Sequence, residues 1–229
     1  MGDQLLPERL ERVVVFEGGD GSGLDTQADL LAEHCHQHGI LFWRTAEPTN
    51  SLHGRAARRV LKEAQLPMSS PDLYQLQRLF VKDRREHVRE MLAHQSRGEL
   101  VICARYIPST IAYATLGGMT FEEVMKMHEG IPEPRIALYL DIPAEEGVRR
   151  KEEQAKKLAE ERGEPLPDHL ELFEQAPTLQ KVRLAYQQLV LKLGYFKMVD
   201  GLGKKEEVHQ RVMEWLGHET SLLDVPTDH

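Results

Sequence analysis

The fold class follows from one stretch of the chain, Val13-Val14-Val15-Phe16-Glu17-Gly18-Gly19-Asp20-Gly21-Ser22-Gly23. Its first four residues are consecutive apolar positions, which is typical of a strand buried on both faces of a parallel sheet. Gly18 and Gly23 then have the G-x-x-x-x-G spacing of a phosphate-binding loop, and a helical pattern follows. Because the backbone N–H groups of such a loop point inward at a helix N-terminus, the stretch predicts a site for phosphate oxygens. The alternative is an ordinary strand-to-helix turn.

The two positions after this loop depart from the usual phosphate-loop pattern. Lysine and then serine or threonine are expected there, and the chain has Leu24 and Asp25. The lysine normally brings positive charge to the β- and γ-phosphates, and the hydroxyl holds Mg²⁺. Leucine can do neither, and an aspartate that binds Mg²⁺ also adds negative charge beside a polyphosphate. Thr26 supplies a hydroxyl one position late, which helix geometry turns about 100° away.

Four further short runs are wholly apolar, or, in the last of them, apolar apart from Lys197. They lie at residues 40–43, 100–103, 136–140 and 196–199, and helical patterns separate every pair. The longest of these helical patterns covers about residues 71–96. Five short buried strands that alternate with helices predict an α/β fold with a doubly wound sheet.

Composition excludes several classes of protein. The 229 residues include 29 Lys and Arg against 37 Asp and Glu, which gives a net charge of -8 and argues against duplex nucleic acid or an anionic membrane as main partner. No stretch approaches the ~18 apolar residues of a membrane span, and the first residues lack the apolar core of a signal peptide. Cys35 and Cys103 are too few for a disulfide framework and are predicted to be small buried thiols. We therefore expect a cytoplasmic protein.

A stretch from Ala144 to Arg162 is dense in charge. Acidic and basic residues recur there at i, i+4 spacing, and each such pair is worth ~0.2–0.5 kcal/mol in a helix. The stretch is therefore predicted to be a solvated helix, with the pairs Glu145–Arg149, Glu146–Arg150, Glu152–Lys156 and Glu153–Lys157.

Together with the glycine loop, the later segments resemble the thymidylate kinases, a branch of the P-loop nucleoside monophosphate kinases. The similar segments follow the family's order from about Val13 to Leu216, so the resemblance is specific for fold and ancestry. They are Phe16 to Gly23 with Thr26 and Gln27, Glu47 to Thr49, Asp83-Arg84 with His87, Val101 to Tyr106 with Ser109 and Ala112-Tyr113, Leu172 to Glu174, Val182 to Tyr186, and Val199 to Gly201.

This resemblance implies a P-loop kinase fold, with a five-stranded parallel sheet flanked by helices and a helical lid at about residues 144–170. It implies a single domain over residues 10–217, and we expect residues 218–229 to form a flexible tail. The implied reaction is ATP- and Mg²⁺-dependent phosphorylation of dTMP, or of a related pyrimidine nucleotide, to its diphosphate. The resemblance also implies a homodimer, with neither nucleic acid nor a membrane as partner.

By resemblance, two sets of residues would bind the two substrates. Phe80 would stack on the thymine ring, Arg84 would bind its edge, and Arg105 would hold the monophosphate. Core packing is the alternative for Phe80 and Tyr113, and a solvated helix face is the alternative for Arg84. The implied acceptor residues are Glu47, Phe80, Arg84, Arg105, Ser109, Thr110 and Tyr113, and the implied donor residues are Gly18, Gly19, Asp20, Gly21, Ser22, Gly23, Leu24, Asp25 and Thr26.

Catalytic roles are implied in the same way. Asp20 would act near the transferring phosphate, Arg105 would hold the acceptor, and Asp25 is the candidate metal ligand. Basic residues of the lid would close over the phosphates, unless this charged stretch is only a salt-bridged surface helix. The lid residues concerned are Arg149, Arg150 and Arg162.

The departures from the family pattern fall where chemistry is done. Besides Leu24 and Asp25, Ala46 stands where the family has arginine and Ala104 where it has aspartate. Phosphoryl transfer depends on positioning and charge, and loss of one preorganised donor commonly costs ~3–4 kcal/mol. We therefore expect strongly impaired catalysis. The alternatives are a nucleotide-binding pseudokinase without turnover, and a kinase with a different donor or monophosphate.

Overall fold

The computed structural model describes residues 6–63, 70–163, 176–219 and 222–224. Five strands form one parallel sheet: β1 (Arg9–Glu17), β2 (Phe42–Ala46), β3 (Leu100–Ala104), β4 (Glu133–Asp141) and β5 (Phe196–Asp200). Their spatial order is β2-β3-β1-β4-β5. The predicted α/β fold with a five-stranded parallel sheet is therefore confirmed.

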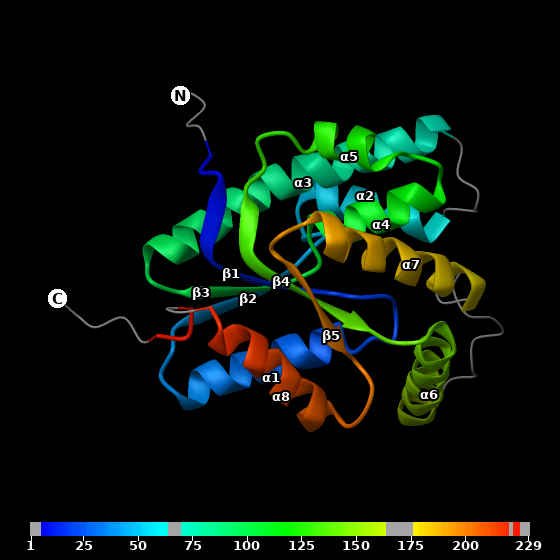
Figure 1. Cartoon of the computed structure of the whole chain (residues 1–229). Coiled ribbons are helices and arrows are strands. Elements are labelled where there is room, and N and C mark those ends of the chain that lie inside the picture. The colour runs from blue at the N-terminus through cyan, green and yellow to red at the C-terminus, as the bar shows by residue number, and fades with distance from the viewer. Residues whose placement is uncertain (1–5, 64–69, 164–175, 220–221, 225–229) are drawn as a thin grey trace.

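Helices cover both faces of the sheet (Figure 1). In the view of Figure 1, α1 and α8 lie below the sheet, while α3, α4, α5 and α7 lie above it. No helix within the described ranges is long and apolar enough to cross a membrane. The helices are α1 (Leu24–Gln37), α2 (Leu52–Glu63), α3 (Ser70–Ser96), α4 (Ile107–Leu116), α5 (Phe121–Met127), α6 (Ala144–Arg162), α7 (Ala176–Lys192) and α8 (Lys205–Gly217).

Strand β1 explains why the sheet has a core on each side. Alternate side chains of a strand point to opposite faces, and every position from Val13 to Phe16 is fully buried. Val13 and Val15 pack with the helices on the α3, α4 and α7 side, whereas Val14 and Phe16 pack with α1 and α8. Full burial of such side chains contributes ~1.5–3 kcal/mol each. The continuous apolar run is therefore the signature of this doubly covered strand.

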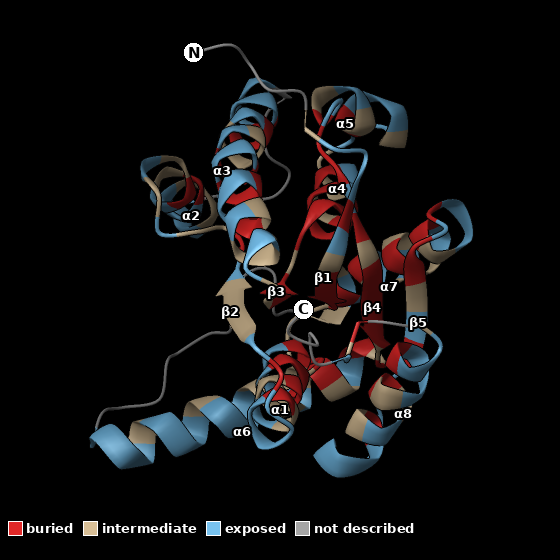
Figure 2. Cartoon of the chain, turned by 90° about the vertical axis from the view of Figure 1, so that its left-hand side faces the viewer, coloured by how far each residue is buried: buried red, intermediate tan, exposed pale blue. Residues whose placement is uncertain are grey.

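The second predicted strand differs from its prediction. β2 begins at Phe42, two residues after the expected start at Ile40, and its residues are only partly buried or exposed. Among the described strands it pairs with β3 alone and forms an edge of the sheet, where Figure 2 shows it at the side of the buried strands. Ile40 is buried, but it packs against the α1 and α8 core from the loop before the strand. The run of four apolar residues is thus part loop and part edge strand.

The charged stretch forms a single helix, α6, and Figure 2 shows it largely exposed. The predicted pair of Glu146 and Arg150 forms, with 2.6 Å between the Arg150 Nε and a carboxylate oxygen. Arg149 pairs with Glu146 and Glu153 in place of its predicted partner Glu145. The predicted lid extends to about residue 170, and residues 164–170 lie outside the described ranges, as do Leu172 to Glu174 of the family resemblance.

Both cysteines are buried free thiols, as predicted. Cys35 lies on α1 and packs in the α1 and α8 core. Cys103 lies on β3 and packs in the core on the other face of the sheet. Of the predicted tail, residues 220–221 and 225–229 lie outside the described ranges, while Leu222 is buried against the α1 and α8 core.

The base of α6 lies against the glycine loop at two glycines. Gly21 has a φ of +80°, and a Cβ built on it would overlap the Gly147 carbonyl oxygen. A Cβ on Gly147 would in turn lie 2.7 Å from the Asp20 carbonyl oxygen, closer than real side chains approach. Glycine at these two positions therefore lets the backbone of α6 contact the loop directly.

The variant Gly147→Ala is expected to lower the free energy of unfolding by about 1–2 kcal/mol. Overpacking commonly costs ~1–3 kcal/mol, and the better helix propensity of alanine returns up to ~1 kcal/mol. Urea unfolding at equilibrium measures the change. Gly194→Ala is the control, because a Cβ there meets no atom within 4 Å. Equal stability of the Gly147→Ala variant and the original chain would contradict this packing.

Candidate active site

Two cavities open along the carboxyl edge of the sheet. The loop cavity has a volume of about 740 Å³ and lies over the glycine loop and the first turns of α6. The helix cavity has a volume of about 410 Å³ and is lined mainly by α2, α3 and α4. Asp20 and Arg105 line both cavities. The two cavities therefore meet at one carboxylate and one guanidinium.

The structure divides the predicted residues between these cavities. The predicted donor residues line the loop cavity, apart from Gly18, which is buried beneath it, and the predicted acceptor residues all line the helix cavity. Around the loop cavity lie Gly19, Asp20, Gly21, Ser22, Gly23, Leu24, Asp25 and Thr26, with Arg105, Arg149 and Arg150. Around the helix cavity lie Glu47, Phe80, Arg84, Arg105, Ser109, Thr110 and Tyr113.

The glycine loop lines the loop cavity and leads into the N-terminus of α1. Gly21 and Gly23 have positive φ angles, and Gly23 caps the N-terminus of α1 without a side-chain hydrogen bond to the helix. The Ser22 Oγ is buried and has no hydrogen-bond partner within the described ranges. The Ser22 hydroxyl packs against Gly18. The helix N-terminus at the cavity fits an anionic oxygen ligand.

Leu24 and Asp25, the two unusual residues after the loop, contact other parts of the protein. Leu24 is 5% exposed and packs in the core between the sheet, α1 and α8. The Asp25 side chain is 73% exposed, and its Oδ1 lies 2.9 Å from Nη2 of Arg44 on β2. Arg44 also pairs with Asp29 at 3.0 Å. The loop itself thus supplies neither a cation nor a hydroxyl at these positions.

The lid arginines differ in what they contact. The Arg150 Nη2 donates to the Gly201 carbonyl oxygen at 3.1 Å, and its Nη1 lies 3.5 Å from the Gly21 carbonyl oxygen. Arg149 is 55% exposed and is held by Glu146 and Glu153. Hydrogen bonds from Arg149 and Arg150 lower the pKa of Glu146 to about 2. Arg150 is therefore the predicted lid arginine that reaches across the loop cavity to the glycine loop.

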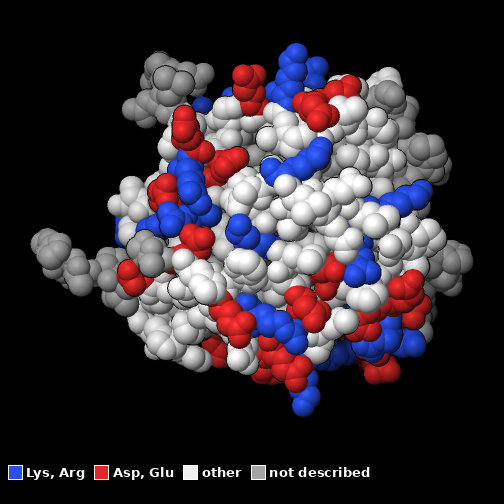
Figure 3. Space-filling model, in the orientation of Figure 1, with Lys and Arg blue, Asp and Glu red and all other residues white. Residues whose placement is uncertain are grey.

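Arg162 is not brought to either cavity. It is exposed in the last turn of α6 and lines neither of them. Figure 3 shows Lys and Arg mixed with Asp and Glu over α6, so its surface has no uniform charge. The far end of the helix fits the salt-bridged surface that was the alternative to a lid role.

Arg105 follows the last residue of β3 and has an unusual backbone conformation. Its φ is +66°, a region that costs a non-glycine residue roughly 1–2 kcal/mol. Its Nη2 donates to the Asp20 Oδ1 at 2.7 Å and its Nη1 to the Gly18 carbonyl oxygen at 3.1 Å. The guanidinium also lies 5.7 Å from the centre of the Tyr113 ring. This conformation therefore carries Arg105 from the sheet to the junction of the two cavities.

Glu17, at the end of β1, fixes the start of α4. Its carboxylate accepts hydrogen bonds from the Tyr106 N–H at 2.7 Å, from the Ser109 hydroxyl, and from the Tyr186 hydroxyl at 3.0 Å. Burial raises the pKa of Glu17, while the Ser109 hydrogen bond and the Arg105 charge act in the opposite direction. The glycine loop and α4 are therefore joined through one buried carboxyl group.

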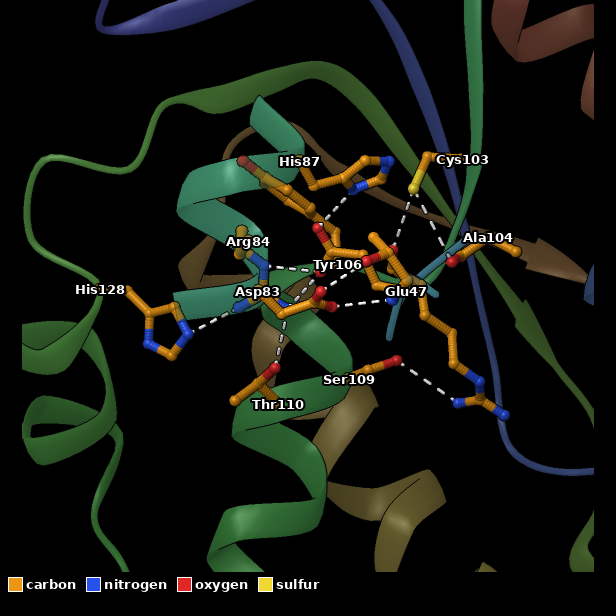
Figure 4. Close-up of polar contacts among 12 residues, drawn as sticks. Glu47, Asp83, Arg84, His87, Cys103, Ala104, Tyr106, Ser109, Thr110 and His128 are labelled. Atoms are coloured by element: carbon orange, nitrogen blue, oxygen red, sulfur yellow. Dashed lines mark hydrogen bonds and ion pairs between the residues drawn. The ribbon is translucent and has the colours of Figure 1, made fainter. Parts of the chain in front are cut away.

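Arg84 is buried at the base of the helix cavity, with 2% of its surface exposed, so its alternative as a solvated helix residue is wrong. Figure 4 shows its guanidinium among side chains from four segments. Its Nε donates to the Glu47 Oε2 at 2.7 Å, its Nη2 to the Thr110 Oγ1 at 3.0 Å, and its Nη1 contacts the His128 Nε2 at 2.6 Å. The other Glu47 oxygen lies 2.9 Å from the His87 Nδ1. Arg84 is therefore held rigidly where it lines the cavity.

The family model for thymidylate kinase matches residues 16–212. The chain belongs to the thymidylate kinase family. It is 34% identical over 209 residues to the probable thymidylate kinase of Pyrococcus abyssi, which covers 90% of this chain and 96% of that one. It is also 34% identical over 179 residues to the thymidylate kinase of Desulfotalea psychrophila, covering 78% and 81% of the two chains. With the thymidylate kinase of Bartonella quintana the identity is 30% over 219 residues, covering 93% and 98%.

The two alanines that depart from the thymidylate kinase pattern are neighbours in the structure. Ala46 ends β2, Ala104 ends β3, and the two are paired in the register of the sheet. Within the described ranges, no group of three or more His, Cys, Asp and Glu side chains is arranged to hold a metal ion. The carboxyl edge thus carries methyl groups at two places where the family pattern has an arginine and an aspartate.

Sequence reasoning missed several residues of the helix cavity. Gln77 is buried, and its Oε1 has no partner within the described ranges. It lies three residues before Phe80 and seven before Arg84, so helical periodicity alone places it on their face of α3. His128 follows α5 and carries no local signal, because it meets Arg84 only through the tertiary fold. The other missed lining residues are Pro48, Arg58, Leu61, Lys62, Leu73, Leu76, Tyr106 and Gly117.

Acidification is expected to destabilise the fold through His128. Burial and the neighbouring Arg84 lower its pKa from 6.5 to about 3. The stability contributed by the neutral imidazole is present above about pH 6.5 and is lost as the pH falls toward about 3. Between pH 7 and pH 5 the loss is about 2 kcal/mol, because the unfolded chain takes up a proton that the folded chain excludes.

Urea unfolding at pH 7 and pH 5 measures this loss. The variant His128→Gln should lose about 2 kcal/mol less stability over that interval than the original chain does. His36→Gln, at an exposed position of α1, is the control and should keep the full loss. Identical acid sensitivity in all three chains would contradict the neutral buried histidine.

Proposed function

We propose that this chain binds ATP in the loop cavity and dTMP in the helix cavity, and transfers the γ-phosphoryl group to dTMP at a strongly reduced rate. The observation that carries this proposal is that the two cavities meet at Asp20 and Arg105. A phosphoryl group passes between donor and acceptor in line, so the two substrates must approach at one point. Family membership supports the same reaction.

The loop cavity fits a nucleoside triphosphate. Its volume of about 740 Å³ lies within the usual range of ~300–1,000 Å³ for ligand sites. The first N–H groups of α1 would supply hydrogen-bond donors for phosphate oxygens. Mg²⁺ would supply neutralisation of phosphate charge, and in such sites phosphate oxygens and water provide most of its ligands. Asp25 would hold the ion only by releasing Arg44.

The helix cavity fits a pyrimidine monophosphate. Phe80 offers an aromatic face, Arg84 offers a fixed donor at the base of the cavity, and Thr110 and Tyr113 complete the wall. Arg105 lies at the junction, where its guanidinium would hold the monophosphate beside Asp20. The acceptor side therefore keeps the cationic groups that binding requires.

Reduced catalysis follows from the donor side. Leu24 is buried in the core, Asp25 is paired with Arg44, and Ala46 and Ala104 carry no charge. Each missing group would act on charge that develops during transfer, where loss of one donor commonly costs ~10²–10³ in rate. A pseudokinase that binds nucleotides without turnover is the second candidate, which the same four residues favour. A kinase with a different donor or monophosphate is the third. We further propose a cytoplasmic homodimer, in keeping with the family.

Release of ADP from ATP, Mg²⁺ and dTMP tests the reaction. The combined variant Leu24→Lys, Asp25→Ser and Ala104→Asp should turn over at least ~10-fold faster than the original chain, because it restores the cation, hydroxyl and carboxylate. Rapid turnover by the original chain would overturn the proposed impairment. Gain of activity only in the combined variant would support the pseudokinase. If calorimetry detects no binding of dTMP, the acceptor assignment is wrong and another monophosphate leads.

Arg150 is expected to supply the main positive charge for the phosphates of ATP. In calorimetry, Arg150→Ala should weaken ATP binding by about 10-fold, equivalent to the loss of one charge-assisted hydrogen bond. Lys156→Ala, exposed on the same helix, is the matched control and should bind ATP like the original chain. Equal weakening by both variants would indicate a nonspecific effect of charge and contradict the role of Arg150.

A further inference from the structure

The guanidinium of Arg84 has almost no free hydrogen-bonding capacity. An arginine carries five N–H donors and no acceptor. Nε donates to Glu47, Nη2 lies 2.6 Å from Glu47 and 3.0 Å from the Thr110 Oγ1, and Nη1 lies 2.6 Å from the His128 Nε2. Four of the five N–H groups thus have an acceptor among the described residues. The donor that remains is the second N–H of Nη1, and Arg84 is a lining residue of the helix cavity.

His128 is arranged to accept from Arg84 and not to donate to it. The imidazole is 2% exposed, and its Nδ1 lies 2.8 Å from the Val124 carbonyl oxygen. A carbonyl oxygen can only accept, so the Nδ1 carries the proton. The Nε2 is then left with its lone pair directed at Nη1 of Arg84, as Figure 4 shows. Since Arg84 is always charged, only this neutral tautomer forms the bond.

The contact determines where the remaining donor points. The two hydrogens of Nη1 lie in the guanidinium plane, so the direction of one determines the direction of the other. Glu47 and Thr110 accept hydrogen bonds from Nε and Nη2 and so fix the orientation of the guanidinium plane. We propose that His128 is a positioning residue that directs the remaining N–H of Arg84 into the helix cavity, where it selects a base that has a carbonyl oxygen at that point.

This inference rests on the proposed function, because it concerns how the proposed dTMP site distinguishes one pyrimidine base from another. An arginine N–H can only donate a hydrogen bond. It therefore binds a carbonyl oxygen and is repelled by an exocyclic amino group, which is also a donor. Thymine carries a carbonyl group where cytosine carries an amino group. A buried donor left against another donor costs ~1–3 kcal/mol, which is about 5- to 150-fold in affinity. His128 would therefore contribute to preference for dTMP over dCMP without touching either nucleotide.

Calorimetry with dTMP, dCMP and 2-deoxyribose 5-phosphate tests the proposal. His128→Leu keeps the bulk and removes the acceptor, and it should weaken dTMP binding about 10-fold and narrow the preference over dCMP. Binding of 2-deoxyribose 5-phosphate, which has no base, should not change. His128→Gln places an amide oxygen near the position of Nε2 and should restore dTMP binding to within about 2- to 3-fold of the original. Thermal melting checks that each variant is folded.

Three outcomes would overturn the inference. In the first, His128→Leu binds dTMP as tightly as the original chain. In the second, the leucine and glutamine variants weaken dTMP and 2-deoxyribose 5-phosphate alike, which indicates general loosening of the site. If His128→Leu does not fold, His128→Asn, whose side chain is too short to reach Arg84, replaces it with the same expected results. In the third, the original chain binds no dTMP, and the proposed function then fails together with the inference.

Discussion

The strands of the sheet run in one direction, and the active-site candidates depend on the edge where their carboxyl ends meet. At this edge β1 ends in Glu17, whose buried carboxylate accepts hydrogen bonds from the Tyr106 backbone and the Ser109 hydroxyl. The strand that leads into the glycine loop is thereby joined to the helix that lines the helix cavity. Arg105 lies between these anchored groups and reaches Asp20 on the loop. The parallel sheet and one buried carboxyl group thus bring the loop cavity and the helix cavity to a common point.

Periodicity and motif order predicted the parts of this structure that are local. The apolar run at Val13 predicted β1 because burial on both faces leaves a continuous pattern. The same pattern at Ile40 predicted a strand that begins only at Phe42 and lies at the edge of the sheet, because an edge strand and a buried loop residue can also be apolar. The pairing of Arg44 with Asp25, the reach of Arg150 and the contact of His128 with Arg84 depend on tertiary distances. No spacing along the chain encodes them.

The helix cavity, on the proposed acceptor side, and the loop cavity, on the proposed donor side, differ in how their charged groups are paired. Arg84 is surrounded by acceptors that hold it in place, so the acceptor side is preorganised before any ligand arrives. On the donor side, the positions that would bear charge are apolar or paired. Ala46 and Ala104 are paired in the sheet register, where the family pattern has an arginine and an aspartate. Replacing both by alanine leaves the net charge at this place unchanged. Neither alanine leaves an unpaired buried charge at the carboxyl edge.

The positive charge over the loop cavity comes from Arg105, from α6 and from Lys205, and the glycine loop itself adds none. Arg150 is attached to α6, and Gly147 fixes the base of that helix against Asp20 and Gly21. A lysine in the phosphate-binding loop would move with that loop. An arginine on α6 is near the loop only when α6 lies against it. The glycine contact therefore fixes where α6 places Arg150 over the loop cavity, as well as how the helix packs against the loop.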